Sequence, residues 1–153
     1  MFPYKKILCP TDFSEASYKA LEEAKNIAKT FSADLLVLHV IGPIPPAGIY
    51  SDVAPADFDI VGYEESLREG VNKRLAQVVD EKLEDTKSRP VVSYGDPGEQ
   101  IVQFADDTDV DLIVIATHGM RGWQHALFGS VAQKVMRKTG RNMLIVHAQK
   151  ENS

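Results

Sequence analysis

Disulfide bonds, zinc clusters and membrane spans have little support in this sequence. Cys9 is its only cysteine, so we expect no disulfide within the chain and no cysteine-based zinc cluster. No group of residues has the spacing of zinc ligands. The apolar run after the first lysines is broken at Pro10 and Asp12, which argues against a signal peptide or membrane span there. We expect a cytoplasmic protein with no membrane partner.

Positive charge is also scarce. The sequence has 17 Lys and Arg against 22 Asp and Glu, a formal net charge of −5 at pH 7. General nucleic-acid binders need basic patches to neutralise phosphates, so we expect no nucleic-acid partner. The one notable basic cluster lies at the end of the last predicted helix, where contact with the helix dipole accounts for it. Its members are Lys134, Arg137, Lys138 and Arg141.

Length and composition fit one globular domain. The 153 residues are 44% hydrophobic and 25% charged, which is enough to bury a sizeable core. We expect a single domain over residues 1–148 and a short tail at 149–153.

Continuous apolar runs predict strands of a parallel sheet, because helices cover both faces of such a sheet. Five runs have this character. They are Lys6–Pro10, Asp34–Val40 and Asp111–Ala116, then Pro90–Tyr94 and Asn142–Ala148. His39 and His147 fall in these runs, and we expect both to be structural histidines rather than metal ligands.

Helical patterns separate these strands. Ser14 is a plausible cap for a first helix, and Asp96, followed by Pro97 and Glu99, is a start signal for a third. Gly140 is expected to end the last helix. The predicted helices cover Glu15–Phe31, about Val61–Lys87, a segment from Pro97, and about Gly129–Thr139. This alternation predicts an α/β fold with a doubly wound parallel sheet and right-handed crossovers.

One connection is long and rich in proline and glycine. It covers Ile41–Gly62 and follows the carboxyl end of a predicted strand. Loops in that position either cover a ligand or contribute to a partner surface, and the residues do not decide between the two.

Two strand ends carry unusual chemistry. The first strand runs into Pro10–Ser14, and the fourth is followed by Thr117–Gly122. Ligands of open parallel sheets bind outside the carboxyl ends of the strands. If the two strands are neighbours, these segments face each other across one crevice.

The glycines after the fourth strand favour a phosphate site. Gly119 and Gly122 allow close backbone approach, and Gly129 with Ser130 opens a helix whose unpaired amides can bind an anion. Arg121 or His118 could add positive charge. The pattern is neither a Walker loop nor a dinucleotide fingerprint, and glycine-rich loops often serve only as turns. Spacing alone leaves both interpretations open.

The chain resembles a single-domain universal stress protein along nearly its full length, from "KKILCPTDFSEAS" through "VSYGDPGEQIVQFADDTDVDLIVIATHG" to "GSVAQKVMRKTGRNMLIVH". The nucleotide-binding branch of that family carries Gly, two residues, Gly, nine residues, then Gly-Ser or Gly-Thr. Gly119, residues 120–128 and Gly129-Ser130 match this pattern. Ala116 replaces the first glycine, the smallest possible change, but alanine lacks glycine's tolerance of positive φ.

The resemblance implies an open five-stranded sheet of order 3-2-1-4-5, like that of the adenine nucleotide alpha hydrolases. It also implies ATP as ligand, with Mg or Mn possible. Asp12 would accept hydrogen bonds from ribose or lie near the metal, and Val40 would meet the adenine. The other implied pocket residues are Pro10, Thr11, Ala116, His118, Gly119, Arg121, Gly122, Gly129, Ser130 and Val131.

Several of these residues also have simpler roles. Asp12 could cap a turn with Ser14, Val40 is an ordinary core residue in either case, and His118 could be a solvated loop histidine. Trp123 takes the place of a common aliphatic residue and could pack the loop onto the body or lie over a neighbouring chain. We favour packing.

Our leading hypothesis is an ATP-binding regulatory module of the stress response. ATP hydrolysis would be slow at most, because no general base is evident beside Arg121 and Asp12. The alternative is an interaction protein of the same fold without nucleotide, suggested by Ala116 and Trp123. An apolar last strand would leave a bare sheet edge. The resemblance implies a homodimer paired through this strand, Asn142–His147, together with protein partners that the sequence does not identify.

Overall fold

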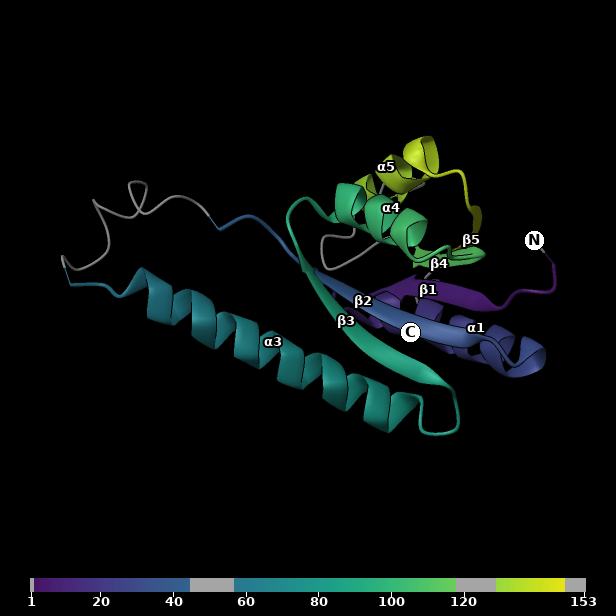
Figure 1. Cartoon of the computed structure of the whole chain (residues 1–153), viewed down its shortest axis with the longest axis horizontal. Coiled ribbons are helices and arrows are strands. Elements are labelled where there is room, and N and C mark those ends of the chain that lie inside the picture. The colour runs from purple at the N-terminus through teal and green to yellow at the C-terminus, as the bar shows by residue number, and fades with distance from the viewer. Residues whose placement is uncertain (1, 45–56, 118–128, 148–153) are drawn as a thin grey trace, which may run out of the picture.

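Five parallel strands form one sheet in the computed structural model, which describes residues 2–44, 57–117 and 129–147. The strand order is β3-β2-β1-β4-β5, so the predicted fold class and order are confirmed. Figure 1 shows the sheet with its two edges, β3 and β5, on opposite sides of the central β1. The strands are β1 Lys6–Pro10, β2 Asp34–Ile41, β3 Ser88–Tyr94, β4 Leu112–Ala116 and β5 Asn142–Val146.

Helices cover both faces of the sheet (Figure 1). The described ones are α1 Glu15–Phe31, α3 Ile60–Lys82, α4 Pro97–Asp107 and α5 Ser130–Lys138. Side chains of α1 and α3 pack with one set of strand residues, and those of α4 and α5 pack with the other. In the described part of the chain, no helix is long and apolar enough to cross a membrane.

The predicted helix start signals are confirmed. The Ser14 side chain accepts a hydrogen bond from the Ser17 amide at the start of α1. Asp96 does the same for the Glu99 amide at the start of α4, with Pro97 in the first turn. At the start of α5, Gly129 is the cap residue and supplies no side-chain hydrogen bond. The last helix therefore begins with amides that its own cap does not satisfy.

The end of α3 differs from the prediction. The helix ends at Lys82, not near Lys87, and the Leu83 amide makes the closing bond to the Val79 carbonyl. Leu83 is buried in the core, and the Lys87 carbonyl already accepts the Leu35 amide beside β2. The chain leaves the helix early because these residues are needed to reach the sheet, and β3 begins at Ser88.

The two edge strands are more exposed than their apolar sequences suggest. Residues of β3 and β5 are partly or fully exposed, whereas those of β1 and β4 are almost all buried. An edge strand has a neighbour on one side only. β5 also ends at Val146, so His147 is exposed beyond the strand and the prediction that it lies within a buried strand is wrong.

The end of α5 also departs from expectation. Thr139 has extended backbone and ends the helix, and its amide bonds to the Val135 carbonyl. Gly140 does not adopt the left-handed conformation; among the described glycines only Gly95 does. The sharp exit at Thr139 makes a left-handed glycine unnecessary.

Basic residues near the end of α5 bind acidic residues of α4 and the turn after it. Lys134 Nζ lies 2.9 Å from Asp96 Oδ1, and Lys138 pairs with Glu99. Arg141, in the turn before β5, lies 3.0 Å from Asp106 and 3.3 Å from Asp109. These pairs hold α4 and α5 side by side, a role that the helix-dipole explanation did not include.

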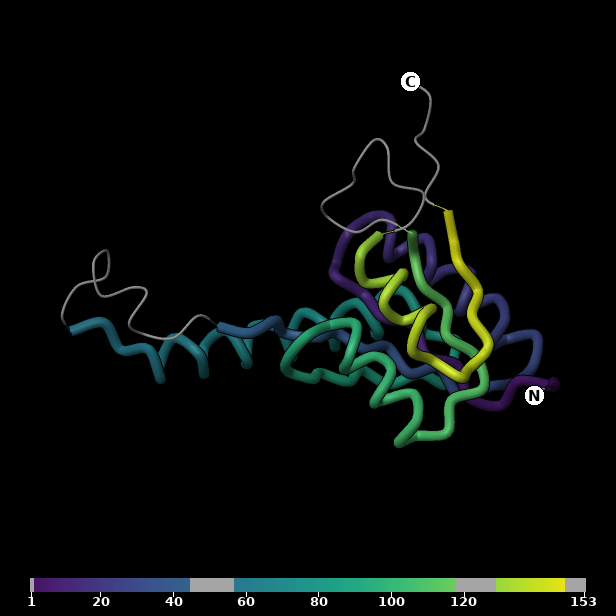
Figure 2. The backbone as a smooth tube through the Cα atoms, turned by 90° about the horizontal axis from the view of Figure 1, so that it is seen from above, coloured from purple at the N-terminus to yellow at the C-terminus, as the bar shows by residue number. Residues whose placement is uncertain are grey.

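The first half of α3 extends past the sheet, as Figure 2 shows. The buried residues of this helix all lie in its second half: Leu75, Val78 and Val79. Near its start, Val61 is 70% exposed and Tyr63 is 52% exposed. The helix is therefore attached to the body mainly through its second half.

Candidate functional site

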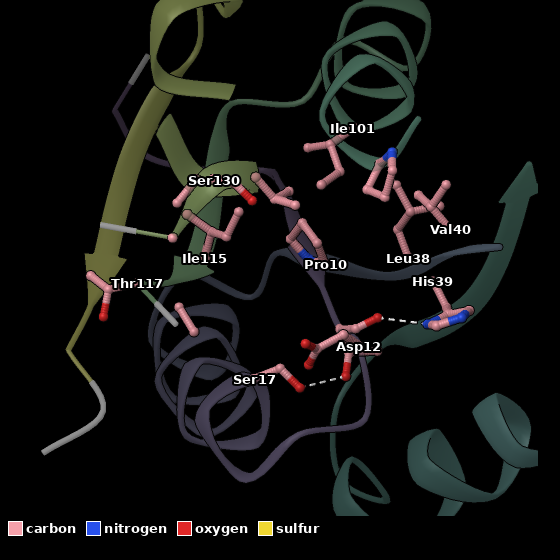
Figure 3. A pocket seen from close by; sticks show the side chains of 16 residues that line it. Pro10, Asp12, Ser17, Leu38, His39, Val40, Ile101, Ile115, Thr117 and Ser130 are labelled. Carbon is pink, nitrogen blue, oxygen red and sulfur yellow. Dashed lines mark hydrogen bonds between the residues drawn. The ribbon is translucent and has the colours of Figure 1, made fainter. Parts of the chain in front are cut away.

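A cavity of about 440 Å³ opens at the carboxyl ends of β1, β2 and β4 (Figure 3). The first turns of α4 and α5 close it from one face of the sheet, and the β1–α1 loop borders it as well. Its lining residues are Pro10, Thr11, Asp12, Ser17, Leu38, His39, Val40, Pro97, Ile101, Ile115, Ala116, Thr117, Gly129, Ser130, Val131 and Ala132. This is the position at which ligands of open parallel sheets bind.

The structure brings together every predicted site residue that it describes. These eight residues all line the cavity: Pro10, Thr11, Asp12, Val40, Ala116, Gly129, Ser130 and Val131. The other predicted residues, His118, Gly119, Arg121 and Gly122, lie outside the described residues, and so does Trp123. That the eight residues bind a nucleotide stays a prediction.

Hydroxyl groups fix the conformation of the β1–α1 loop. The Ser17 hydroxyl donates to the Ser14 carbonyl at 2.9 Å. Its oxygen lies 2.8 Å from Thr11 Oγ1, so Thr11 is the donor in that contact (Figure 3). Thr11 Oγ1 in turn accepts the Phe13 amide at 3.1 Å. Thr11 and Ser17 are both buried, so this network stabilises the loop from inside.

The Asp12 carboxylate has the capping role, which is one of the roles that the sequence left open. Its Oδ1 accepts the Ser14 amide at 3.0 Å and the Ser14 hydroxyl at 2.5 Å, which is the capping role. The same side chain also lines the cavity. The described residues contain no group of three or more His, Cys, Asp or Glu that could hold a metal. A metal at Asp12 would therefore need most of its ligands from a bound phosphate and from water.

His39 is a hydrogen-bonded strand histidine, as predicted, and it also lines the cavity. Its Nδ1 lies 2.8 Å from the Thr11 carbonyl (Figure 3). A carbonyl can only accept, so Nδ1 carries the proton. Burial lowers the pKa of His39, while the bond to Thr11 and the charge of Asp12 act in the opposite direction. The neutral His39 ring thus supports the β1–α1 loop where it borders the cavity.

Backbone hydrogen bonds join β4 to the start of α5. The Gly129 amide donates to the Thr117 carbonyl, and the Thr117 amide donates to the Val146 carbonyl at 3.1 Å. The Thr117 side chain is buried, and its hydroxyl has no hydrogen-bond partner among the described residues. A buried hydroxyl without a partner is costly, and Thr117 directly precedes residues that lie outside the described part of the chain.

Ala116 fits its position without strain. It is the last residue of β4, pairs with Val146 of β5, and is not among the residues with positive φ. The tolerance of positive φ that glycine would provide is therefore not needed here.

The described lining is mainly apolar and holds no lysine or arginine. Leu38, Val40, Ile101 and Ile115 supply aliphatic surface, while Asp12 and the first turn of α5 supply polar groups. Such a site suits a flat apolar group that carries polar substituents. Sequence reasoning did not assign the other eight lining residues to the site. Pro97 and Ile101 are among them, although α4 begins at the same edge of the sheet as the predicted residues.

A family model described as the universal stress protein family matches residues 3–147. Universal stress protein MJ0577 of Methanocaldococcus jannaschii is 33% identical, covering 94% of this chain and 94% of its own. A solved structure of MJ0577 gives a TM-score of 0.75 at 29% identity, covering 97% of this chain and 99% of that one. A universal stress protein in complex with cAMP gives a TM-score of 0.65 at 25% identity, covering 94% and 97%. The chain therefore belongs to the universal stress protein family.

Proposed function

We propose that this protein binds ATP in the cavity and acts as a nucleotide-dependent regulatory module of the stress response. The observation that carries the proposal is the uncapped start of α5, because Gly129, Ser130 and Val131 line the same cavity as Asp12 and Val40. Free amides at a helix N-terminus bind phosphate well.

The two ends of the cavity suit the two ends of a nucleotide. Val40 and Ile101 offer an apolar surface for the base, and the α5 amides suit the phosphates. The Asp12 carboxylate can accept hydrogen bonds from ribose hydroxyls or share a Mg or Mn ion with the phosphates. The solved relative that holds cAMP supports an adenine nucleotide as the ligand class.

Any hydrolysis should be slow. Rapid phosphoryl transfer needs a positioned water and neutralisation of the leaving phosphate. Asp12 is the only carboxylate in the described lining, and its Oδ1 is already bonded to Ser14. Steady phosphate release that disappears in Asp12→Ala, with the fold intact, would demonstrate a slow ATPase. If the protein binds ATP but releases no phosphate over time, it is a binding module without ATPase activity.

We also propose a homodimer paired through β5. This strand bonds to β4 on one side and is the sheet edge on the other, and Leu144 on it is 37% exposed. Pairing with a second copy would satisfy the free edge. Leu144→Lys should shift the mass in light scattering from dimer to monomer. Met136→Lys, on an exposed residue of α5, is the matched control.

Nucleotide content is the test of the proposed function. Freshly purified protein is denatured, and the supernatant is analysed by anion-exchange chromatography and mass spectrometry. Bound or added Mg-ATP should raise the melting temperature, since a ligand at 100 times its Kd stabilises a protein by about 2.7 kcal/mol. Mg-tripolyphosphate is the control for non-specific anion binding. A supernatant without nucleotide, together with a melting temperature that Mg-ATP does not change, would contradict the proposal. The alternative, an interaction protein of the same fold without nucleotide, would then be favoured.

A further inference from the structure

Helix α3 places three cationic groups over aromatic rings of the body. Arg68 lies 4.6 Å from the Tyr94 ring, Arg74 lies 4.2 Å from the Phe13 ring, and Lys82 lies 4.5 Å from the Tyr18 ring. Each ring belongs to a different segment: the end of β3, the β1–α1 loop and α1. Only the middle contact reaches the loop that borders the cavity.

Phe13 has an unusual backbone for a residue with a side chain. Its φ is +64°, in the left-handed region, between Asp12 and the cap residue Ser14. Residues other than glycine hold this conformation when surrounding contacts impose it. The turn lets Asp12 accept both the amide and the hydroxyl of Ser14 while its side chain lines the cavity.

Two contacts hold the Phe13 ring from outside the loop. The His39 ring lies 4.5 Å away, centroid to centroid, at an interplanar angle of 30°. The Arg74 guanidinium lies over the ring as well. His39 also bonds to the Thr11 carbonyl at 2.8 Å. Arg74 of α3 thus contacts Phe13, Phe13 contacts His39 of β2, and His39 bonds to Thr11. These contacts hold the segment Thr11–Phe13 at both ends.

We propose that Arg74 and Phe13 are positioning residues of the nucleotide site: Arg74, by its contact with the Phe13 ring, holds the turn that places the Asp12 carboxylate in the cavity. The part of this inference that concerns ATP affinity rests on the proposed function. Helix α3 thereby influences nucleotide affinity although no residue of α3 lines the cavity in the described part of the chain.

Arg74 can be changed without removing what attaches the helix. It is an exposed residue of α3, whereas the attachment comes from Leu75, Val78 and Val79 in the core. Arg68 offers a matched control, because it is exposed, lies on the same helix and makes the same kind of contact with Tyr94 at the end of β3. A purely structural role would give the two arginines equal effects.

The experiment compares Arg74→Met with Arg68→Met in two measurements. Calorimetric titration gives the ATP affinity, and NMR hydrogen exchange of the ligand-free protein gives protection of the Ser14 amide, which bonds to Asp12. Arg74→Met should weaken ATP binding by about two- to fivefold, the range expected from losing one exposed cation–π contact. It should also speed exchange at Ser14, and Arg74→Lys should restore part of both. Phe13→Leu removes both ring contacts. It should therefore weaken ATP binding and speed Ser14 exchange more than Arg74→Met does.

The two proposals fail in different ways. If the native protein binds no nucleotide, the proposed function fails, and the exchange comparison alone decides whether Arg74 holds the loop. Equal exchange at Ser14 in Arg74→Met and Arg68→Met overturns the inference, whatever binds. Native binding that Arg74→Met leaves unchanged also overturns it, even if the loop exchanges faster.

Discussion

Two chain segments that each begin a helix border the cavity, and they differ in how their polar groups are satisfied. In the β1–α1 loop, Thr11 accepts the Phe13 amide and Asp12 accepts the Ser14 amide. The Ser14 hydroxyl accepts the Ser17 amide in the first turn of α1. At the start of α5, Gly129 offers no such bond. Within the described residues, side chains bond the amides of the loop, whereas the first amides of α5 have no bond from their cap residue. The phosphate site that we propose therefore combines a loop bonded by its own side chains with a helix start whose amides can donate to an anion.

Ser130→Asp should break this contrast most strongly. A carboxylate in the first turn stabilises a helix by about 0.3–1 kcal/mol, so the ligand-free protein should melt at the same temperature or higher. The same charge repels a phosphate bound there, and ATP affinity should fall on the order of a hundredfold. Gln133→Asp, on an exposed residue of α5 outside the cavity, is the control. Undiminished ATP binding would place the phosphates elsewhere.

Thr11→Val tests whether the hydrogen bonds within the β1–α1 loop stabilise the protein. The valine keeps the shape but leaves the Phe13 amide without its acceptor and Ser17 without its donor. A buried polar group left unpaired costs about 1–3 kcal/mol, so urea unfolding should show a loss of about 2 kcal/mol. The control is Thr30→Val, whose hydroxyl bonds to the Asn26 carbonyl on the exposed side of α1. Equal losses would mean that the loop network contributes nothing special.

Ser14→Ala should have a smaller effect. It removes the cap of α1 and one partner of Asp12, and a lost cap costs about 1 kcal/mol. Asp59→Ala removes the cap of α3, where the helix extends past the sheet. Its cost should be lower, because fraying there exposes no core residue. Chemical denaturation measures the free energy of unfolding of both variants. A larger loss in Asp59→Ala than in Ser14→Ala would contradict this expectation.

The smallest effect concerns His39 and pH. Burial lowers its folded pKa below the ordinary value near 6.5, so the unfolded chain binds the proton more readily. Stability should therefore fall as pH drops from about 6.5 through the folded pKa. Melting temperatures of native protein and His39→Asn between pH 8 and 5 measure this. Asparagine keeps a donor for the Thr11 carbonyl but cannot titrate. Its melting temperature should vary less with pH, and identical curves would refute the assignment.

Local sequence patterns were enough to predict a doubly wound parallel sheet, whereas the strand order came from the family resemblance. The bounds of β1 and α1 and the caps Ser14 and Asp96 follow from neighbouring residues alone. The family resemblance supplied the described pocket residues, and they lie together because parallel strands end at one edge of the sheet. Residues as distant as Asp12 and Ser130 meet there for that topological reason.

Features that depend on distant partners could not be predicted. An apolar run does not reveal whether its strand is central or at an edge, so the exposure of β3 and β5 was missed. The partners of Lys134 and Lys138 lie on another helix, which no local pattern indicates. The early end of α3 depends on where Leu83 finds the core. The left-handed Phe13 carries no sequence signal, because such turns usually contain glycine.

The hydrogen bond between Gly129 and Thr117 has a consequence for variation in chain length. It holds Thr117 and Gly129 next to each other, whatever number of residues lies between them. Closing a longer loop costs little entropy, about 0.6 kcal/mol for each doubling of its length. Insertions or deletions between these two residues should therefore leave the register of β4 and β5 unchanged. Evolution and protein engineering can therefore change the length of the chain between Thr117 and Gly129 independently of the sheet.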